Sequence, residues 1–288
     1  MPDIIQLLVK ASLLLLVLSS GLQAQWQDLT HAFRRPELLL VGFVAVNVVV
    51  PLTAIILCLL LPVAPLTKAG LVIMAVSPLA PFAPGKMRKS GANKGFVYGL
   101  YVALLLAAVI IVPATIAVLD NLSRFDVAVP VKDMAGFVAT SVLCPLVAGV
   151  AIATFWPRFA QRAAPIARIA ASIVIYAAIL FILVTTGTKL IGLAGDGTLT
   201  VIVLTVISGI AAGHWLGGPH PEQRIALAMA ATTRHPGIAA LIAHRNFDDP
   251  QVMLAVVLFL VISMGVCAAY GRWIRTLDAA RSGFRQLR

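Results

Sequence analysis

Apolar runs separated by short polar connections follow one another along the chain. Most of them approach or exceed the ~17 residues that a helix needs to cross the hydrocarbon core of a bilayer. They predict nine spans, at residues 4–20, 38–61, 69–92, 95–119, 134–156, 169–186, 199–215, 222–243 and 252–270. The predicted fold class is therefore an all-α integral membrane protein with nine transmembrane helices.

The third and eighth runs are interrupted by proline, glycine and basic residues. One interruption reads Ser-Pro-Leu-Ala-Pro-Phe-Ala-Pro-Gly-Lys at residues 77–86, and the other reads Thr-Thr-Arg-His-Pro-Gly at residues 232–237. Their Pro-Gly pairs lie 152 positions apart, and each pair precedes a short half-helix, a polar turn and a long apolar span. Unwound backbone inside a bilayer must line a cavity or be buried in protein, so matched breaks predict the substrate site of a transporter.

The two breaks also predict how the chain is divided. Since the first broken helix runs inward and the second outward, the halves form an inverted repeat. Residues 1–125 make the first repeat, with four helices of which the third is broken. Residues 126–288 make the second, with five helices of which the eighth helix of the chain is broken, followed by a basic tail. No separate soluble domain is expected.

Composition supports the membrane class and excludes others. With 60% hydrophobic and 11% charged residues and a mean hydropathy of +1.00, the chain has too little polar surface for a water-soluble globule. The net charge is +11, but most basic residues lie in short connections, a pattern that orients a membrane protein. We therefore expect the lipid bilayer as a partner and no nucleic acid, and the oligomeric state stays open.

Counting Lys and Arg orients the chain. With the N-terminus outside, fifteen basic residues fall on the inner side, among them Arg158, Arg162 and Arg168 in one connection, and five fall outside. Cleavage of the first span as a signal peptide would invert this bias. Lys10, within the first span, is expected to snorkel outward. The predicted location is a bacterial inner (plasma) membrane, with the N-terminus outside and the C-terminus cytoplasmic.

The breaks hold the candidate substrate-binding residues. These are Ser77, Pro78, Phe82, Pro84, Gly85 and Lys86 in the first break, and Thr232, Thr233, Arg234, His235, Pro236 and Gly237 in the second. The start of each second half-helix favours an anion, and Arg234 adds a planar donor fork suited to a carboxylate, sulfonate or phosphate. A charge at this depth costs about 2.5 kcal/mol or more, so we expect Arg234 to face a cavity that holds a small anionic substrate.

Other polar residues near the breaks leave alternatives open. Lys86, Arg88 and Lys89 either line the inner approach to the site or anchor the topology. His235 either couples transport to protons, because imidazole titrates near neutrality, or is a neutral ring bonded to an unwound carbonyl. The basic tail either anchors the topology or binds anionic lipid or a partner.

The sequence gives little support for catalysis or for a bound metal. Cys58, Cys144 and Cys267 stand singly in apolar stretches, so we expect buried packing residues and no disulfide or zinc site. An intramembrane Asp pair, a metal-ligand cluster and a Ser/His/Asp grouping are all missing, which disfavours an enzyme. Neither a cofactor nor a metal is predicted.

Several motifs resemble the bile acid:sodium symporter family, within a larger group that includes bacterial bile acid, arsenite and auxin efflux-like carriers. They are Ser-Gly-Leu ending at residue 22, Arg-Pro-Glu-Leu at residues 35–38, Ala-Gly-Leu at residues 69–71, and Pro-Gly-Ile-Ala-Ala-Leu at residues 236–241 followed by His244 and Phe247. The resemblance implies a nine-helix carrier in which a panel of helices 1, 2, 5, 6 and 7 rocks against a core of helices 3, 4, 8 and 9.

The chain departs from this family at the ion-binding positions. Sodium-coupled members follow the first proline with Gly-Gly and Thr-Ala-Ser-Asn, where this chain has Leu79, Ala80 and then residues 81–84. They also place a glutamate and a glutamine where this chain has Ala230 and Arg234. Every acidic residue here falls in a loop, a tail or a helix end. Since sodium prefers oxygen ligands, the resemblance implies a carrier that is not sodium-coupled through the family's usual sites.

The sequence thus predicts a secondary carrier of a small organic anion. A transport-inactive relative that acts as a receptor or scaffold is the main alternative, because the family's ion ligands are lost. Flux in proteoliposomes separates the two.

The orientation gives the first testable prediction. Reporter fusions at Arg288 and within residues 121–132 should report opposite sides of the membrane, with Arg288 inside, because of the charge bias. Finding both reporters on one side would end this topology.

Overall fold

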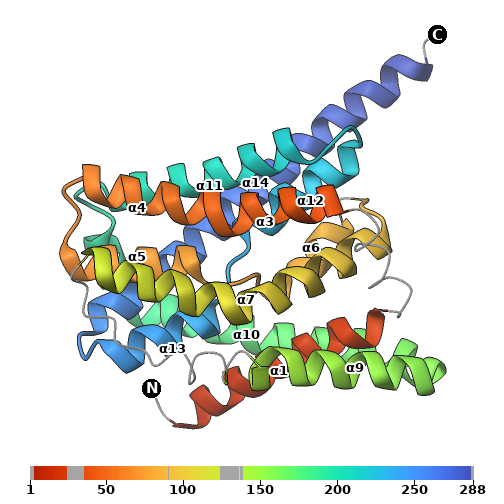
Figure 1. Ribbon diagram of the computed structural model, residues 1–288, viewed down its shortest axis with the longest axis horizontal. Coiled ribbons are helices and arrows are strands. Elements are labelled where there is room, and N and C mark those ends of the chain that lie inside the picture. Colours follow the sequence, from red (N-terminus) through yellow and green to blue (C-terminus); the bar gives the residue numbers. More distant parts are fainter. Residues whose placement is uncertain (1–2, 25–35, 90, 124–135, 137–138, 287–288) are drawn as a thin grey trace.

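The computed structural model describes residues 3–24, 36–89, 91–123, 136 and 139–286, and helices make up nearly all of these (Figure 1). The helices are α1 (Asp3–Gln23), α3 (Pro36–Phe43), the π-helix η1 (Val44–Val49), α4 (Val50–Leu60), α5 (Pro65–Val76), α6 (Ala83–Lys89), α7 (Lys94–Ser123), the π-helix η2 (Ala139–Leu143), α9 (Cys144–Phe155), α10 (Pro157–Leu193), α11 (Thr198–Leu216), α12 (Pro221–Thr232), α13 (Pro236–Asn246) and α14 (Pro250–Gln286). Each of the nine predicted spans contains a helix.

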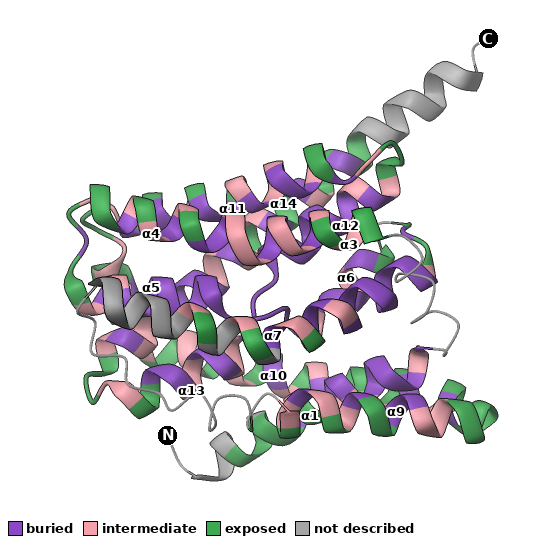
Figure 2. Ribbon diagram, viewed as in Figure 1, coloured by how far each residue is buried: buried purple, intermediate pink, exposed green. Residues whose placement is uncertain are grey.

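Length and apolarity mark this as a membrane protein. Within the described residues, four helical stretches are long and apolar enough to cross a bilayer: Pro36–Leu60, Pro157–Leu193, Thr198–Leu216 and Pro250–Thr276. Shorter apolar helices cover Lys10–Gln23, Pro65–Val76, Lys94–Ala108 and Ala139–Phe155. Large apolar residues are exposed on the outer helices, while α5 and α12 are mostly buried (Figure 2). The count of nine spans and the inverted repeat, whose boundary lies outside the described residues, stay predictions.

Both predicted helix breaks are confirmed. The first broken helix stops at Val76 and resumes at Ala83, and the second stops at Thr232 and resumes at Pro236. Residues 77–82 are called here the first break and residues 233–235 the second break. The two breaks pass each other near the middle of the molecule (Figure 1). Both predicted Pro-Gly pairs lie in the first turns of the following helices, α6 and α13, and not in the unwound backbone. The two breaks together with these first turns, residues 83–86 and 236–237, are called the crossing.

The helices group differently from the expected panel and core. α1, α9 and α10 pack mainly on one another and form a three-helix bundle. The expected placement of the second and seventh spans in the same panel is wrong, because α4 and α11 pack on each other and on the broken helices α5 and α12. The packing therefore separates the three-helix bundle from the helices around the breaks.

Small residues explain why α11 lies against the broken helix. A Cβ placed on Gly213 would meet the main chain of Ala228 in α12, and one on Gly209 would meet Val50 of α4 and the Ala231 carbonyl. Bare glycine surfaces let helix backbones approach closely, and this gives dispersion contacts that a membrane protein needs because lipid is as apolar as its side chains. α1 and α9 approach each other closely in the same way, at Gly21 and Gly149. A Cβ built on Gly21 would lie 3.0 Å from the Cα of Gly149.

Two further expectations are corrected. Arg158, Arg162 and Arg168 lie on α10, which begins at Pro157, and not in a connection. The stretch around them is rich in Ala and Arg, which are strong helix formers, so the helix continues through it despite Pro165. Cys144 is exposed, whereas Cys58 and Cys267 are buried as expected. Cys144 opens α9 on an outer surface where apolar residues face outward, so apolarity around a cysteine did not mean burial in protein.

The close contact at Gly213 predicts that adding one methyl group destabilises the protein at this position but not at an open one. Gly213→Ala should lower the free energy of unfolding by about 1–3 kcal/mol, because the methyl meets main-chain atoms that cannot move aside. Gly187→Ala in α10 makes the same change where nothing lies within 4 Å, and it should be neutral or slightly stabilising. Thermal unfolding of the purified variants measures both, and equal effects would contradict this account of the α11–α12 contact.

Candidate functional site

The two breaks are joined by main-chain hydrogen bonds. Leu79 and Arg234 form an antiparallel β-bridge. The Ala80 N–H donates to the Thr233 carbonyl at 3.0 Å, and the His235 N–H donates to the Pro78 carbonyl at 2.8 Å. Inside a bilayer an unpaired N–H or C=O costs several kcal/mol, so each break supplies partners for the other.

Prolines and hydroxyls determine where the helices stop. Proline lacks an N–H, so Pro78 and Pro81 cannot continue the bonding pattern of α5. The Ser77 hydroxyl donates back to the Ile73 carbonyl at 2.8 Å, and the Thr233 hydroxyl donates to the Met229 carbonyl at 2.6 Å. Thr232 likewise contacts the carbonyls of Ala228 and Met229, each at 3.2 Å. These three predicted site residues therefore close their own helices with their hydroxyl groups.

Arg234 lies inside the crossing and is 1% exposed. Its Nη1 donates to the Ser77 carbonyl at 3.2 Å, and its Nη2 donates to the Val46 carbonyl at 2.6 Å. Its Nε is buried without a hydrogen-bond partner among the described residues. The expected cavity-facing fork is thus engaged by main-chain oxygens in this structure.

The Val46 carbonyl is free because of a π-helix and a proline. Val46 lies in η1, where a carbonyl accepts from the N–H five residues later. For Val46 that residue is Pro51, which has no N–H to donate. The Val46 carbonyl therefore has no partner within its own helix, and it accepts a hydrogen bond from Arg234. Sequence reasoning did not identify Val46 as part of the site, although Pro51 within the second span was a visible signal.

His235 caps the helix that follows it. Its Nδ1 accepts from the N–H of Ile238 at 3.2 Å, and α13 begins at Pro236. A ring nitrogen that accepts a hydrogen bond carries no proton, so the imidazole is in the neutral form with its proton on Nε2. Nε2 is buried without a partner among the described residues. Of the two roles expected for His235, the structure favours the neutral ring, with a main-chain N–H as its partner.

Five of the twelve predicted site residues are partly exposed: Phe82, Gly85, Lys86, Pro236 and Gly237. The Lys86 ammonium lies 5.1 Å from the centroid of the Phe82 ring. A Cβ on Gly85 would have nothing within 4 Å, so the chain leaves open space there. Pro84 is buried at the start of α6.

The three-helix bundle covers this partly exposed edge of the crossing. Phe82 packs against Leu16 of α1 and Ala171 and Ile175 of α10. A Cβ on Gly237 would meet the Leu13 side chain of α1, and the Ser20 hydroxyl donates to the Pro81 carbonyl at 3.3 Å. The seven buried candidates lie beneath this junction.

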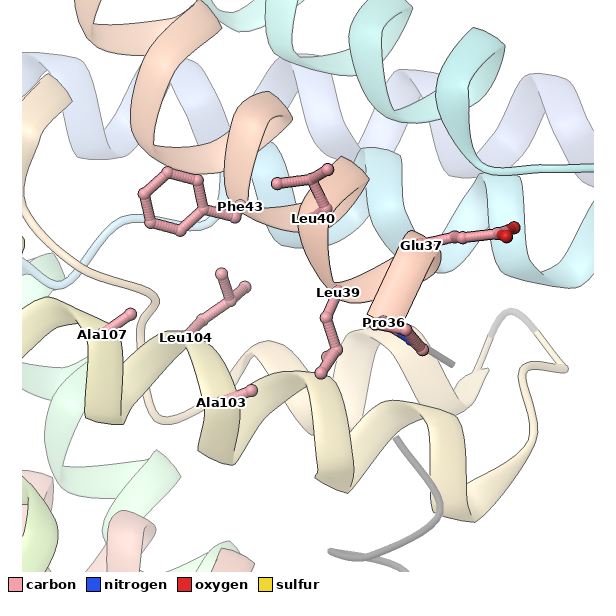
Figure 3. Close-up of a pocket in the computed structure, with 8 residues that line it drawn as sticks. All are labelled: Pro36, Glu37, Leu39, Leu40, Phe43, Ala103, Leu104 and Ala107. Atoms are coloured by element: carbon pink, nitrogen blue, oxygen red, sulfur yellow. The ribbon is translucent and has the colours of Figure 1, made fainter. Parts of the chain in front are cut away.

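A groove of about 540 Å³ lies elsewhere, between α3 and α7, and contains none of the twelve predicted residues. Figure 3 shows Leu39 pointing from α3 toward α7 and Leu104 pointing from α7 toward α3, while the Glu37 carboxylate points away. Its walls are otherwise apolar, so it offers no polar group that could orient a charged solute. Within the described residues no group of three His, Cys, Asp or Glu side chains could hold a metal ion.

The chain matches the model of a known family. The model of the Sodium Bile acid symporter family (SBF) matches residues 11–193, which is well over half of the chain. The match includes the first break and ends before the second. No curated protein matches the chain.

The cap at His235 predicts how substitutions there behave. His235→Ala should lower the free energy of unfolding by about 0.5–2 kcal/mol, because the Ile238 N–H loses its acceptor. His235→Asn should retain most of the stability, because asparagine accepts the same bond. Thermal unfolding of both variants checks this. If Asn destabilises as much as Ala, the imidazole acts through some contact other than the cap.

Proposed function

We propose that this chain, which belongs to the Sodium Bile acid symporter family, is a secondary transporter. It moves a small organic anion by alternating access around the crossing. Nine spans in an inverted repeat, with the N-terminus outside and the C-terminus in the cytoplasm of a bacterium, are part of this proposal. Breaks paired in opposite directions agree with it, because an inverted repeat brings its two interrupted helices together near the midplane.

The main support for an anionic substrate is the positive charge of the crossing. Arg234 is buried there and Lys86 is half-buried in the first turn of α6, whereas no Asp or Glu is buried among the side chains whose burial is described. A positive site without a carboxylate inside a membrane attracts an anion, and a cationic substrate would be repelled.

The partly exposed residues of the crossing are the best candidates for contact with the anion. Lys86 offers an ammonium group next to an open position at Gly85, and Phe82 offers an apolar ring. We therefore assign the charged end of the substrate to Lys86 and its apolar part to Phe82, with Pro236 and Gly237 on the other wall. Arg234 attracts the anion by its charge without direct contact, because its Nη1 and Nη2 already donate to carbonyls.

Motion of the three-helix bundle would open and close this surface. The bundle contacts the crossing through small or apolar groups, namely Leu13 on Gly237, Leu16 on Phe82 and one hydroxyl contact from Ser20. Apolar contacts have little directional preference, so they can shift without leaving unpaired polar groups. We assign α4 and α11 to the part that stays together, because they pack on the broken helices.

A ligand screen followed by flux tests this proposal. Purified protein should be stabilised by organic anions and not by matched cations or neutral analogues, and proteoliposomes should take up the best anion. Lys86→Gln should weaken that anion about 3- to 30-fold, because a partly exposed charge contributes less than a buried one. Lys89→Gln removes the same charge from an exposed position on the same helix and should have little effect.

Three outcomes bear against the proposal. Binding of cations alone would refute the anionic substrate, and equal effects of the two lysine variants would remove Lys86 from the site. Binding without flux would favour the receptor or scaffold.

A further inference from the structure

The three-helix bundle makes a sharp turn between α9 and α10 (Figure 1). α9 ends at Phe155 and α10 begins at Pro157, so the single residue Trp156 joins them. The Trp156 N–H donates to the Ile152 carbonyl at 2.8 Å, and the Trp156 carbonyl accepts from the Ala160 N–H at 3.0 Å. Both main-chain groups of this residue are therefore held by the adjoining helices. Residues 155–162 are called the corner here.

Three aromatic side chains are exposed at the corner. Phe155, Trp156 and Phe159 are 73%, 65% and 61% exposed, and the first two rings lie edge to face with their centroids 6.2 Å apart. Amphipathic rings such as indole collect where the hydrocarbon of a bilayer meets its headgroups. The rings of the corner therefore suit the boundary region of a membrane.

The packing of α1 agrees with this depth. Leu22 lies two residues past the first predicted span, and it packs against Ala160 and Ala164 of α10. The Ser19 hydroxyl, which is still within that span, donates to the Ala164 carbonyl at 3.0 Å. The start of α10 thus lies beside the end of the apolar part of α1. With 37 residues α10 is ~55 Å long, so it can extend past a hydrocarbon core of ~30 Å at this end.

Two arginines at the start of α10 have no counter-charge. Arg158 and Arg162 are exposed, and their spacing of four residues puts them on one side of the helix. Neither has a hydrogen-bond or ion-pair partner among the described residues. α9 and α10 contain no Asp or Glu along their lengths. Two exposed guanidinium groups without a carboxylate are suited to a phosphate, which accepts hydrogen bonds from their planar forks.

The same side of α10 continues as an apolar surface. Ile166, Ile169 and Ile173 follow Arg162 at spacings of three and four residues, and they are 68%, 57% and 63% exposed. Such spacings keep side chains on one side of a helix. The surface is therefore basic at the corner and apolar beyond it, which is the order of headgroup and acyl chain in a phospholipid.

We propose that this side of α10 binds an anionic phospholipid. Its phosphate lies on Arg158 and Arg162, and one acyl chain lies along Ile166, Ile169 and Ile173. An anionic headgroup is favoured over a zwitterionic one, because the ammonium group of the latter offsets the charge of its phosphate. The lipid fixes the three-helix bundle to the membrane at the corner, and this inference does not depend on the proposed transport.

A purely topological role of the two arginines makes a different prediction. Charges that only orient the chain act through their number and sign, so lysine would serve as well as arginine. A phosphate site uses the fork of the guanidinium, and lysine presents a point charge in its place.

The experiment uses the fluorescence of Trp156 to measure which lipid lies at the corner. Trp26→Phe, Trp215→Phe and Trp273→Phe leave Trp156 as the only indole of the full-length chain. The protein is reconstituted in phosphatidylcholine vesicles with a minor amount of a lipid whose chains are brominated, because bromine quenches a nearby indole. Brominated phosphatidylglycerol should quench Trp156 more than the same amount of brominated phosphatidylcholine.

Substitutions should reduce this preference at the corner alone. Arg158→Gln and Arg162→Gln should each lower it about 5-fold, because a basic residue near an anionic headgroup contributes about 1 kcal/mol. Replacing both arginines by Lys should lose part of the preference, although the charge is kept. Lys189→Gln is the matched control, since it removes one charge from an exposed position near the other end of α10, and it should change nothing.

A second measurement covers a background that does not fold. If the three tryptophan substitutions abolish folding, thermal unfolding of the chain with its tryptophans intact is compared in micelles that contain either lipid. Phosphatidylglycerol should raise the unfolding temperature more than phosphatidylcholine does, because a ligand of the folded state stabilises it. The two glutamine variants should lose this difference.

Three results would overturn the proposal. The first is equal quenching by the two brominated lipids when both arginines are present. The second is an equal loss of preference in Lys189→Gln, which would indicate a general effect of net charge. The third is full retention in the double lysine variant, which would leave only the topological role. None of these results bears on the anion screen, so the two proposals can fail separately.

Discussion

The structure depends on one requirement, that polar groups of the main chain be paired where two helices unwind inside a membrane. A helix satisfies its own N–H and C=O groups, but each break releases several of them where water is absent. The crossing meets this requirement by joining the breaks to each other through Ala80 and His235, and by directing hydroxyls onto the last carbonyls of α5 and α12. Two interruptions that would each be costly alone are mutually satisfied.

Arg234 pairs two further main-chain carbonyls, and it does so with a charged side chain. Its guanidinium links the end of α5 to η1, so that one side chain of the second break contacts two other elements. The π-helix and Pro51 are needed for this, because an ordinary helix at that position would retain its carbonyls. The positive charge that results is left without a buried carboxylate among the described side chains, and this is the basis for proposing an anionic substrate.

The arrangement also combines close backbone contacts with looser side-chain contacts. α11 and α12 are in close backbone contact through Gly213, and α4 joins them, whereas the three-helix bundle contacts the crossing through Leu13, Leu16 and Ser20. Close backbone contacts resist displacement, and a few side-chain contacts do not. The proposed alternating access needs such a division, and the partly exposed residues Phe82, Gly85 and Lys86 lie close to it.

The sequence alone determined the membrane class, the positions of the helices and the two breaks, because apolar length and proline act locally. It also identified Arg234 as exceptional, since a charge within an apolar run is visible without a structure. It could not identify the partners of Arg234, because main-chain carbonyls occur at every residue and only the packing of η1 and α5 decides which are free. It likewise assigned the second and seventh spans to the wrong group, because glycines such as Gly213 are common in membrane helices, and the surface each one meets is decided only when the helices assemble.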